Sequence, residues 1–227
     1  MKVGVVIAAG GASSRMGFNK LLAELNGIPA IVRTVLAFDT IEQVEQIVVV
    51  TSDQQVKNII ANCPFKHEIS FADGGENRFL SAKNGFDALS GCDFVAVHDG
   101  ARPFVTADEI KMVFSEAYKH SAAILAVPAK ETVKITQGGF IALTPPRENL
   151  YMAQTPQVFS CNLYKKSLEL AEEREHDSFT DDSQLVEQTG AKVKICEGSY
   201  NNIKLTTPAD MAQAEQLAKK QDSGKDG

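Results

Sequence analysis

Short runs of apolar, β-branched residues alternate along this chain with longer stretches in which apolar residues recur every three or four positions. The first pattern is typical of buried strands and the second of helices with one buried face. Single helices separate consecutive strands, which predicts parallel βαβ units and a doubly wound, mostly parallel α/β sheet. The predicted strands are Val3–Ala9, Ile47–Thr51, Phe94–His98 and Ala123–Val127, and a helix is predicted over Ile28–Phe38.

Polar residues mark the predicted starts of three further helices. Ser52 with Gln55, and Thr106 with Glu109, have the spacing of a capping box, in which each side chain satisfies the other residue's free backbone N–H. Thr207 precedes a proline, an order typical of a first helical turn.

The alternation is interrupted between Pro128 and Pro146. Here Thr132–Ile135 and Phe140–Leu143 flank Gln137-Gly138-Gly139, which predicts a β-hairpin that projects from the sheet. An exposed hairpin edge is protected when it pairs with a second subunit, although an ordinary surface hairpin fits the pattern equally well. We predict a single domain over residues 1–220, with residues 129–148 as a projecting arm and residues 221–227 as a flexible tail.

The composition narrows the class of protein. The 227 residues are 44% hydrophobic and 23% charged, the balance of a soluble globular domain, and the net charge of −6 argues against a nucleic-acid scaffold. The four cysteines form no C-x-x-C pair, so we expect reduced thiols rather than a zinc site or disulfides. The apolar run Val3–Ala9 is too short to span a membrane. These features predict a cytoplasmic protein.

The clearest candidate for a binding site is the segment after the first predicted strand. Ala8-Ala9-Gly10-Gly11 lets backbone N–H groups approach a ligand closely, and Arg15 and Lys20 follow with positive charge. Small residues next to cations at the carboxyl end of a strand are typical of a phosphate site. A tight turn from strand to helix is the alternative interpretation.

Three further clusters carry polar side chains. Gly75, Glu76 and Ser81 surround a glycine turn that, taken alone, indicates a helix entry more than a site. Asp99 and Arg102 follow a buried strand, where an acid can bind a metal ion or a substrate hydroxyl, or can simply pair with the arginine. Lys204 interrupts an apolar run, so its ammonium either reaches water at an edge or points toward an anion; the spacing does not decide between these.

Six segments together resemble a known family. They are A-A-G-G-x-S-S-R-M-G-x-N-K, G-G-E-N-R-x-x-S, H-D-G-A-R-P-F, A-Q-T-P-Q-x-F, T-D-D-x-x-L-V-E and N-I-K-L-T-T-P-x-D. In this order, over about Val3 to Met211, they resemble the 2-C-methyl-D-erythritol 4-phosphate cytidylyltransferase family. The family more often has Asp where Glu76 stands.

The resemblance implies an enzyme that moves CMP from CTP onto 2-C-methyl-D-erythritol 4-phosphate with release of pyrophosphate, a step of non-mevalonate isoprenoid synthesis. It implies Mg²⁺ as cofactor, with Asp99 as its ligand, and a homodimer joined through the arm. The implied roles are nucleotide binding by Ala8, Ala9, Gly10, Gly11, Gly75, Glu76 and Ser81, catalysis by Arg15 and Lys20, acceptor binding by Asp99, Arg102, Thr180 and Lys204, and acceptor binding across the dimer by Thr132 and Arg147.

Three alternatives stay open on the residues alone. Ribitol-5-phosphate cytidylyltransferase uses the same nucleotide chemistry on a similar polyol phosphate. Molybdenum-cofactor nucleotidyltransferases share G-G-x-x-x-R-M-G-x-x-K with the first loop, but that similarity leaves the arm and A-Q-T-P-Q-x-F unexplained. A non-catalytic nucleotide-binding module is the third alternative; charges at Arg15, Lys20, Asp99 and Lys204 together favour an enzyme over it.

Overall fold

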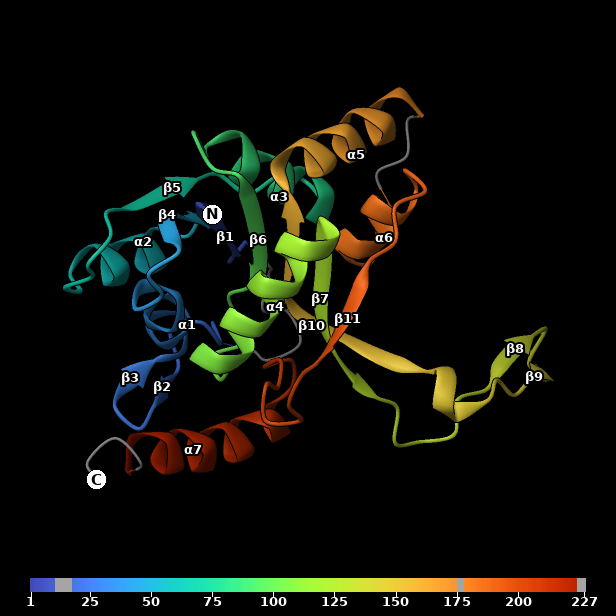
Figure 1. Ribbon diagram of the computed structural model, residues 1–227. Helices are drawn as coiled ribbons and strands as arrows, with labels where there is room; N and C mark the ends of the chain where they lie inside the picture. Colours follow the sequence, from blue (N-terminus) through green and yellow to red (C-terminus); the bar gives the residue numbers. More distant parts are fainter. Residues whose placement is uncertain (11–17, 175–177, 224–227) are drawn as a thin grey trace.

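A seven-stranded sheet runs through the centre of the computed structural model, which describes residues 1–10, 18–174 and 178–223 (Figure 1). The strand order is β11-β7-β10-β6-β1-β4-β5, and every neighbouring pair is parallel except the two that β10 makes. The predicted doubly wound, mostly parallel α/β fold is therefore confirmed. The strands are β1 (Val3–Ala8), β4 (Val44–Val50), β5 (Ile69–Ala72), β6 (Phe94–Asp99), β7 (Ala122–Pro128), β10 (Tyr151–Ser160) and β11 (Lys194–Glu197).

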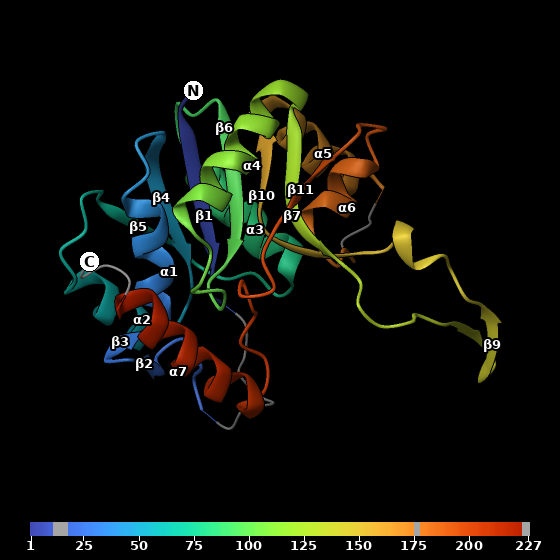
Figure 2. The same cartoon turned by 60° about the horizontal axis from the view of Figure 1, so that its bottom comes forward.

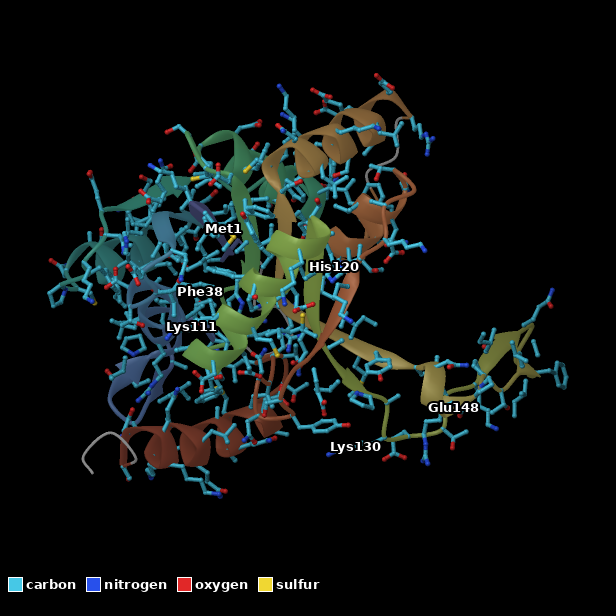
Figure 3. The ribbon with its side chains drawn as sticks, viewed as in Figure 1. Met1, Phe38, Lys111, His120, Lys130 and Glu148 are labelled. Atoms are coloured by element: carbon cyan, nitrogen blue, oxygen red, sulfur yellow. The ribbon has the colours of Figure 1, made fainter. Side chains whose placement is uncertain are left out.

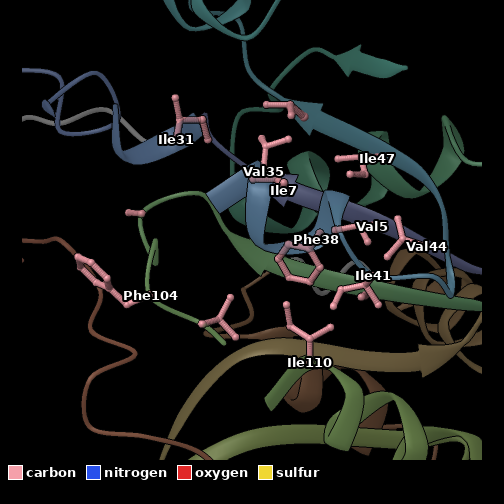
Figure 4. Close-up of a cluster of buried hydrophobic side chains, with 14 of the residues drawn as sticks. Val5, Ile7, Ile31, Val35, Phe38, Ile41, Val44, Ile47, Phe104 and Ile110 are labelled. Atoms are coloured by element: carbon pink, nitrogen blue, oxygen red, sulfur yellow. The ribbon is translucent and has the colours of Figure 1, made fainter. Parts of the chain in front are cut away.

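Helices cover both faces of the sheet because the buried strands are apolar on both sides. Side chains alternate between faces along a strand, so Val5 and Ile7 enter one apolar cluster and Val6 enters the other. Figure 4 shows part of the first cluster, in which Phe38 and Ile110 pack over the sheet. The first cluster takes in α1 (Ala30–Asp39), α2 (Gln54–Ala61), α4 (Ala107–His120) and α7 (Pro208–Ser223), and the second takes in α3 (Arg78–Asp87), α5 (Cys161–Glu173) and α6 (Asp182–Glu187).

The predicted helix starts are right in part. The capping box of α4 is confirmed, since Thr106 Oγ1 accepts from the Glu109 N–H and the Glu109 carboxylate accepts from the Thr106 N–H. The capping box at Ser52 is wrong: Asp53 caps α2 and accepts from the Gln55 N–H at 2.8 Å.

Helix α1 also begins later than predicted. The predicted first residues of the helix, Ile28–Pro29, instead form β3, which pairs with β2 (Glu24–Leu25) in a small hairpin. Asn26 and Gly27 have positive φ angles of 48° and 77° at its turn. A backbone of that kind starts a hairpin rather than a helical turn.

The predicted projecting hairpin is present and extends away from the body of the molecule (Figures 1 and 2). Its strands are β8 (Ile135–Gln137), two to three residues later than predicted, and β9 (Phe140–Leu143), as predicted. Gly138 and Gly139 form the two-residue turn with φ of 56° and 83°, a conformation that favours glycine. A short 3₁₀ helix, Arg147–Asn149, leads back into β10, and the labelled Lys130 and Glu148 mark the arm in Figure 3.

The last helix packs back onto the β2–β3 hairpin. Asp222 accepts two hydrogen bonds from the buried guanidinium of Arg33, which also donates to the carbonyl of Leu25. Residues 221–223 of the predicted tail are the last residues of α7, and the ion pair of Asp222 joins them to the body of the molecule; residues 224–227 lie outside the described residues. No helix within the described ranges is long and apolar enough to cross a membrane.

Candidate functional site

The carboxyl ends of β1 and β6 lie side by side at the centre of the sheet. Ala8 is paired with Asp99 on one side and with Val50 of β4 on the other. The chain leaves β1 toward β4 and later returns to β6 on the opposite side, and this change of direction opens a crevice at the strand ends. Gly100 closes the junction: its N–H donates to the Ala8 carbonyl at 2.9 Å, and a Cβ there would lie 3.0 Å from that oxygen.

A cavity of about 440 Å³ occupies this crevice. Its volume suits a small organic ligand. Nine of the residues predicted for a site line it, and the nine are Ala8, Ala9, Gly10, Lys20, Gly75, Glu76, Ser81, Asp99 and Lys204. Predicted residues from five separate places in the sequence thus share one cavity.

The glycine turn before α3 forms one wall of the cavity. A Cβ on Gly75 would lie 2.3 Å from Cβ of Leu80, so only glycine fits there. The Gly75 N–H donates to Ser81 Oγ at 3.0 Å, and this hydroxyl donates to the Asn77 carbonyl at 2.9 Å. Asn77 in turn caps α3 by accepting from the Leu80 N–H. The turn therefore forms part of the cavity wall and also leads into helix α3, as the sequence indicated.

Asp99 is the centre of charge in the site. Its Oδ2 accepts from Lys204 Nζ at 3.0 Å and from Arg102 Nε at 3.1 Å. Burial raises the pKa of this carboxyl, but the charges of Lys204 and Arg102 outweigh burial and lower the pKa to about 2. Both interpretations of the aspartate are thus compatible, since it forms the local pair with Arg102 and also lines the cavity. Of the two interpretations of Lys204, the structure favours the second, and the anion toward which its ammonium points is the Asp99 carboxylate.

A second cavity, of about 230 Å³, adjoins the first. Arg78, Asp99 and Lys204 line both cavities, so the two share one charged border. Arg102 and Thr180, both predicted for the acceptor side, line the second cavity only. The other residues around it are Ala153, Gln154, Thr155, Gln157 and Asp181.

A buried histidine holds the Asp99 turn from behind. His98 Nε2 lies 3.1 Å from the carbonyl of Arg102, so this nitrogen carries the proton and donates. Thr155 Oγ1 lies 3.0 Å from His98 Nδ1 and accepts from the Asp99 N–H at 3.0 Å. Burial lowers the pKa of His98 to about 4, which keeps the imidazole neutral near pH 7. His98 therefore supports the site and is not one of its charges.

Two of the predicted site residues, Gly11 and Arg15, lie outside the described residues. Thr132 and Arg147 lie exposed on the arm, where an Arg147 Nη1 donates to the Lys130 carbonyl at 3.2 Å. Neither arm residue is among the described residues that line the two cavities of its own chain.

Several residues in the site escaped prediction. Thr155 and Gln157 line the second cavity, and they came from a motif, A-Q-T-P-Q, to which no role could be given. The available signal was the presence of polar residues within a stretch otherwise typical of a strand.

Asp99 is the carboxylate that a divalent metal could bind on the border shared by the two cavities. Within the described ranges, no three His, Cys, Asp or Glu side chains gather closely enough to hold a metal ion by themselves. Asp99 lies on the border of both cavities and stays ionised, and one or two carboxylates together with substrate phosphates are the usual ligands of Mg²⁺. The donor set fits Mg²⁺ shared with a phosphate ligand.

Comparisons with known proteins agree with one another. A family model described as 2-C-methyl-D-erythritol 4-phosphate cytidylyltransferase matches residues 3–220. The enzyme of that name from Caldanaerobacter subterraneus subsp. tengcongensis is 41% identical over 97% of this chain and 100% of its own length. The one from Geobacter metallireducens is 38% identical over 96% and 98% of the two chains.

Solved structures give the same result. The crystal structure of 4-diphosphocytidyl-2C-methyl-D-erythritol synthase from Anaerococcus prevotii matches with a TM-score of 0.85 at 30% identity, and the match covers 96% of each chain. The 2-C-methyl-D-erythritol 4-phosphate cytidylyltransferase from Thermus thermophilus matches with a TM-score of 0.79 at 30% identity, over 96% of this chain and all of that one.

The buried neutral histidine predicts a specific loss of stability in acid. His98 has a folded pKa near 4, below the ordinary value of about 6.5 that the unfolded chain has. Between these two pH values the unfolded state binds a proton that the native state does not. The free energy of unfolding should therefore fall as the pH drops from 6.5 to 4, by up to about 3 kcal/mol from this residue.

Urea unfolding of the wild type and of His98→Gln, in metal-free buffer across that range, measures this contribution. Glutamine does not titrate, so the wild type should lose stability relative to the variant as the pH falls. Parallel stability curves for the two proteins would show that the histidine is not held neutral.

Proposed function

The chain belongs to the 2-C-methyl-D-erythritol 4-phosphate cytidylyltransferase family, and on that premise we propose that its two adjoining cavities bring together the two substrates of that reaction. The enzyme transfers CMP from CTP to 2-C-methyl-D-erythritol 4-phosphate and releases pyrophosphate, a step of isoprenoid synthesis. We assign CTP to the larger cavity and the acceptor to the smaller one. The observation that carries this assignment is the border of Arg78, Asp99 and Lys204 that the two cavities share.

The reaction joins two anions, and the charges of the site suit that task. The attacking atom is an oxygen of the acceptor phosphate, which is ionised near neutral pH, so no strong general base is required. The barrier comes mainly from repulsion and alignment, which fixed cations reduce. Lys20 lines the larger cavity and Lys204 the border, which supports assigning both to the charge where the α-phosphate of CTP meets the acceptor. Arg15 has the same role by family resemblance.

We assign nucleotide binding to the backbone that follows β1 and to the glycine turn before α3. Ala8, Ala9 and Gly10 present small side chains or none to the cavity, so a phosphate can approach their backbone closely. The wall of Gly75, Glu76 and Ser81 offers backbone and side-chain partners for the cytosine ring, in a turn too tight for a larger residue at Gly75.

We assign acceptor binding to the residues that line the smaller cavity. Arg102 and Lys204 supply positive charge for the acceptor phosphate, and Thr180 and Asp181 supply polar groups for its hydroxyls. The side chain of Lys204 is 42% exposed although its ammonium pairs with Asp99, so it can contact a ligand without losing that pair.

We assign Mg²⁺ to Asp99. In the described part of the chain both ion pairs of this residue use Oδ2, and we assign Oδ1 to the metal. When bound, Mg²⁺ would offset the negative charge of the triphosphate as the α-phosphorus becomes five-coordinate. Asp99 itself contributes a charge that stays negative across the working pH range and a position fixed by Thr155 and His98.

We also propose that the arm joins two copies of the chain. Its exposed apolar side chains include Phe140, which is 80% exposed, with Ile141, Leu143 and Ile135. An exposed apolar hairpin of this kind suits a protein partner better than water. A second copy is the partner that gives Thr132 and Arg147 a site to reach, since neither lines the cavities of its own chain.

A cytoplasmic location is part of the same proposal. All four cysteines are unpaired, and burial raises the pKa of each thiol, so none is set up for oxidation. Unpaired thiols are usual in the reducing cytoplasm.

A substrate panel tests the proposed reaction. With CTP and Mg²⁺, pyrophosphate release should be at least tenfold faster with 2-C-methyl-D-erythritol 4-phosphate than with ribitol 5-phosphate. Lys20→Ala should lose roughly 10²–10³-fold in kcat, as expected when one fixed contact to transition-state charge is removed. Lys165→Ala, on the exposed face of α5, is the matched control and should keep the wild-type rate. Faster turnover of ribitol 5-phosphate, or near-normal turnover by Lys20→Ala, would contradict the assignment.

Light scattering tests the arm. The wild type should have twice the chain mass of 24.5 kDa, and Phe140→Asp should be monomeric and slow, because a charge on the apolar arm opposes pairing. Tyr118→Asp changes another exposed aromatic residue, on α4, and should stay dimeric. An active wild-type monomer would show that the arm residues do not complete a neighbouring site.

A further inference from the structure

Two contacts join the wall of the nucleotide cavity to the segment that lines the acceptor cavity. Nη2 of Arg78, in the first turn of α3, donates to Oδ2 of Asp182 in the first turn of α6. Beside this ion pair the rings of Phe79 and Phe179 lie with their centroids 5.8 Å apart. Neighbouring residues of α3 thus hold both sides of Thr180, which lines the acceptor cavity.

Asp182 is placed to hold neighbouring residues in position and not to contact a ligand. It is 1% exposed, and it is not among the described residues that line either cavity. Its Oδ1 accepts from the hydroxyl of Tyr164 at 2.7 Å, and Tyr164 is itself fully buried and stacked on Phe159 of β10. The carboxylate is therefore fixed from the core side and faces Arg78 with its other oxygen.

The ion pair also determines where the charge of Arg78 lies. A carboxylate buried to this degree needs a charged or hydrogen-bonded partner, and Arg78 is that partner. The arginine side chain is 30% exposed and lines both cavities, so without Asp182 it could turn toward a bound phosphate. One contact thus restrains a mobile cation and anchors the acceptor segment.

We propose that Asp182 is a positioning residue for the acceptor: through its ion pair with Arg78 it sets residues 178–183 at the distance from the nucleotide wall that the acceptor requires. This inference rests on the proposed function, because it assigns a further residue to the same reaction. It predicts that loss of the carboxylate charge weakens acceptor use and leaves CTP use intact, since the glycine turn keeps its own hydrogen bonds.

Asp182→Asn is the direct test, because an asparagine oxygen can still accept from Tyr164 while the charge is lost. The KM for 2-C-methyl-D-erythritol 4-phosphate should rise at least tenfold, and the KM for CTP should stay within twofold of wild type or fall. Asp182→Glu restores the charge and should recover most of the acceptor affinity. The control, Asp87→Asn, removes the carboxylate of an exposed ion pair on the same α3 helix and should change neither KM.

Hydrogen exchange gives a second readout that needs no turnover. In Asp182→Asn the amides of residues 178–183 should exchange faster than in the wild type, with little change in α4. Equal rises in both KM values, or unchanged KM values and unchanged exchange in this segment, would overturn the inference. If the wild type failed to use 2-C-methyl-D-erythritol 4-phosphate, the proposed function would fail, and the exchange result would still decide whether Asp182 anchors the segment.

Discussion

The carboxylate of Asp99 is the charge around which the rest of this site is arranged. A buried anion is stable only when cations or hydrogen-bond donors surround it, and Asp99 has Arg102 from its own turn and Lys204 from the far end of the sequence. The Asp99 N–H donates to the hydroxyl of Thr155, and this hydroxyl also contacts the ring of His98. The other ring nitrogen of His98 donates to the carbonyl of Arg102. The two cations, which repel each other, are thereby kept together at the cavity border, where we propose that the two substrate phosphates meet.

The sheet brings this group to the nucleotide. The parallel register of β1 and β6 puts Asp99 beside Ala8, so the acid that we assign to the acceptor and the backbone that we assign to the nucleotide are neighbours. The antiparallel β10 lies next to β6 and supplies Thr155 and Gln157 to the smaller cavity. Because β7 and β10 also run on into the arm (Figure 1), β10 connects the smaller cavity to the segment that we propose reaches a second subunit.

Much of this arrangement could be predicted from local patterns. Apolar runs located β1, β6 and β7, and the glycine turns and charged strand ends named most residues of the larger cavity. Strand β10 was missed because Gln154, Thr155 and Gln157 interrupt its apolar pattern; these polar residues are nevertheless buried, and they line the smaller cavity. The cap at Asp53 was missed because Ser52 and Gln55 have the three-residue spacing of a capping box, whereas Asp53 accepts from the Gln55 N–H only two residues later. The pairs Arg78–Asp182 and Arg33–Asp222 join residues far apart in the chain, and no local pattern signals such contacts.

A double-mutant cycle on Asp99 and Lys204 tests most directly whether this carboxylate organises the cations. The measurement is kcat/KM for 2-C-methyl-D-erythritol 4-phosphate at saturating CTP in Asp99→Asn, Lys204→Met and the double variant. If the two residues act as a unit, each single change should cost roughly 10²–10³-fold, and the double variant should be within about tenfold of the slower single variant. Losses that multiply in the double variant would show that Lys204 works without Asp99, and would contradict the account.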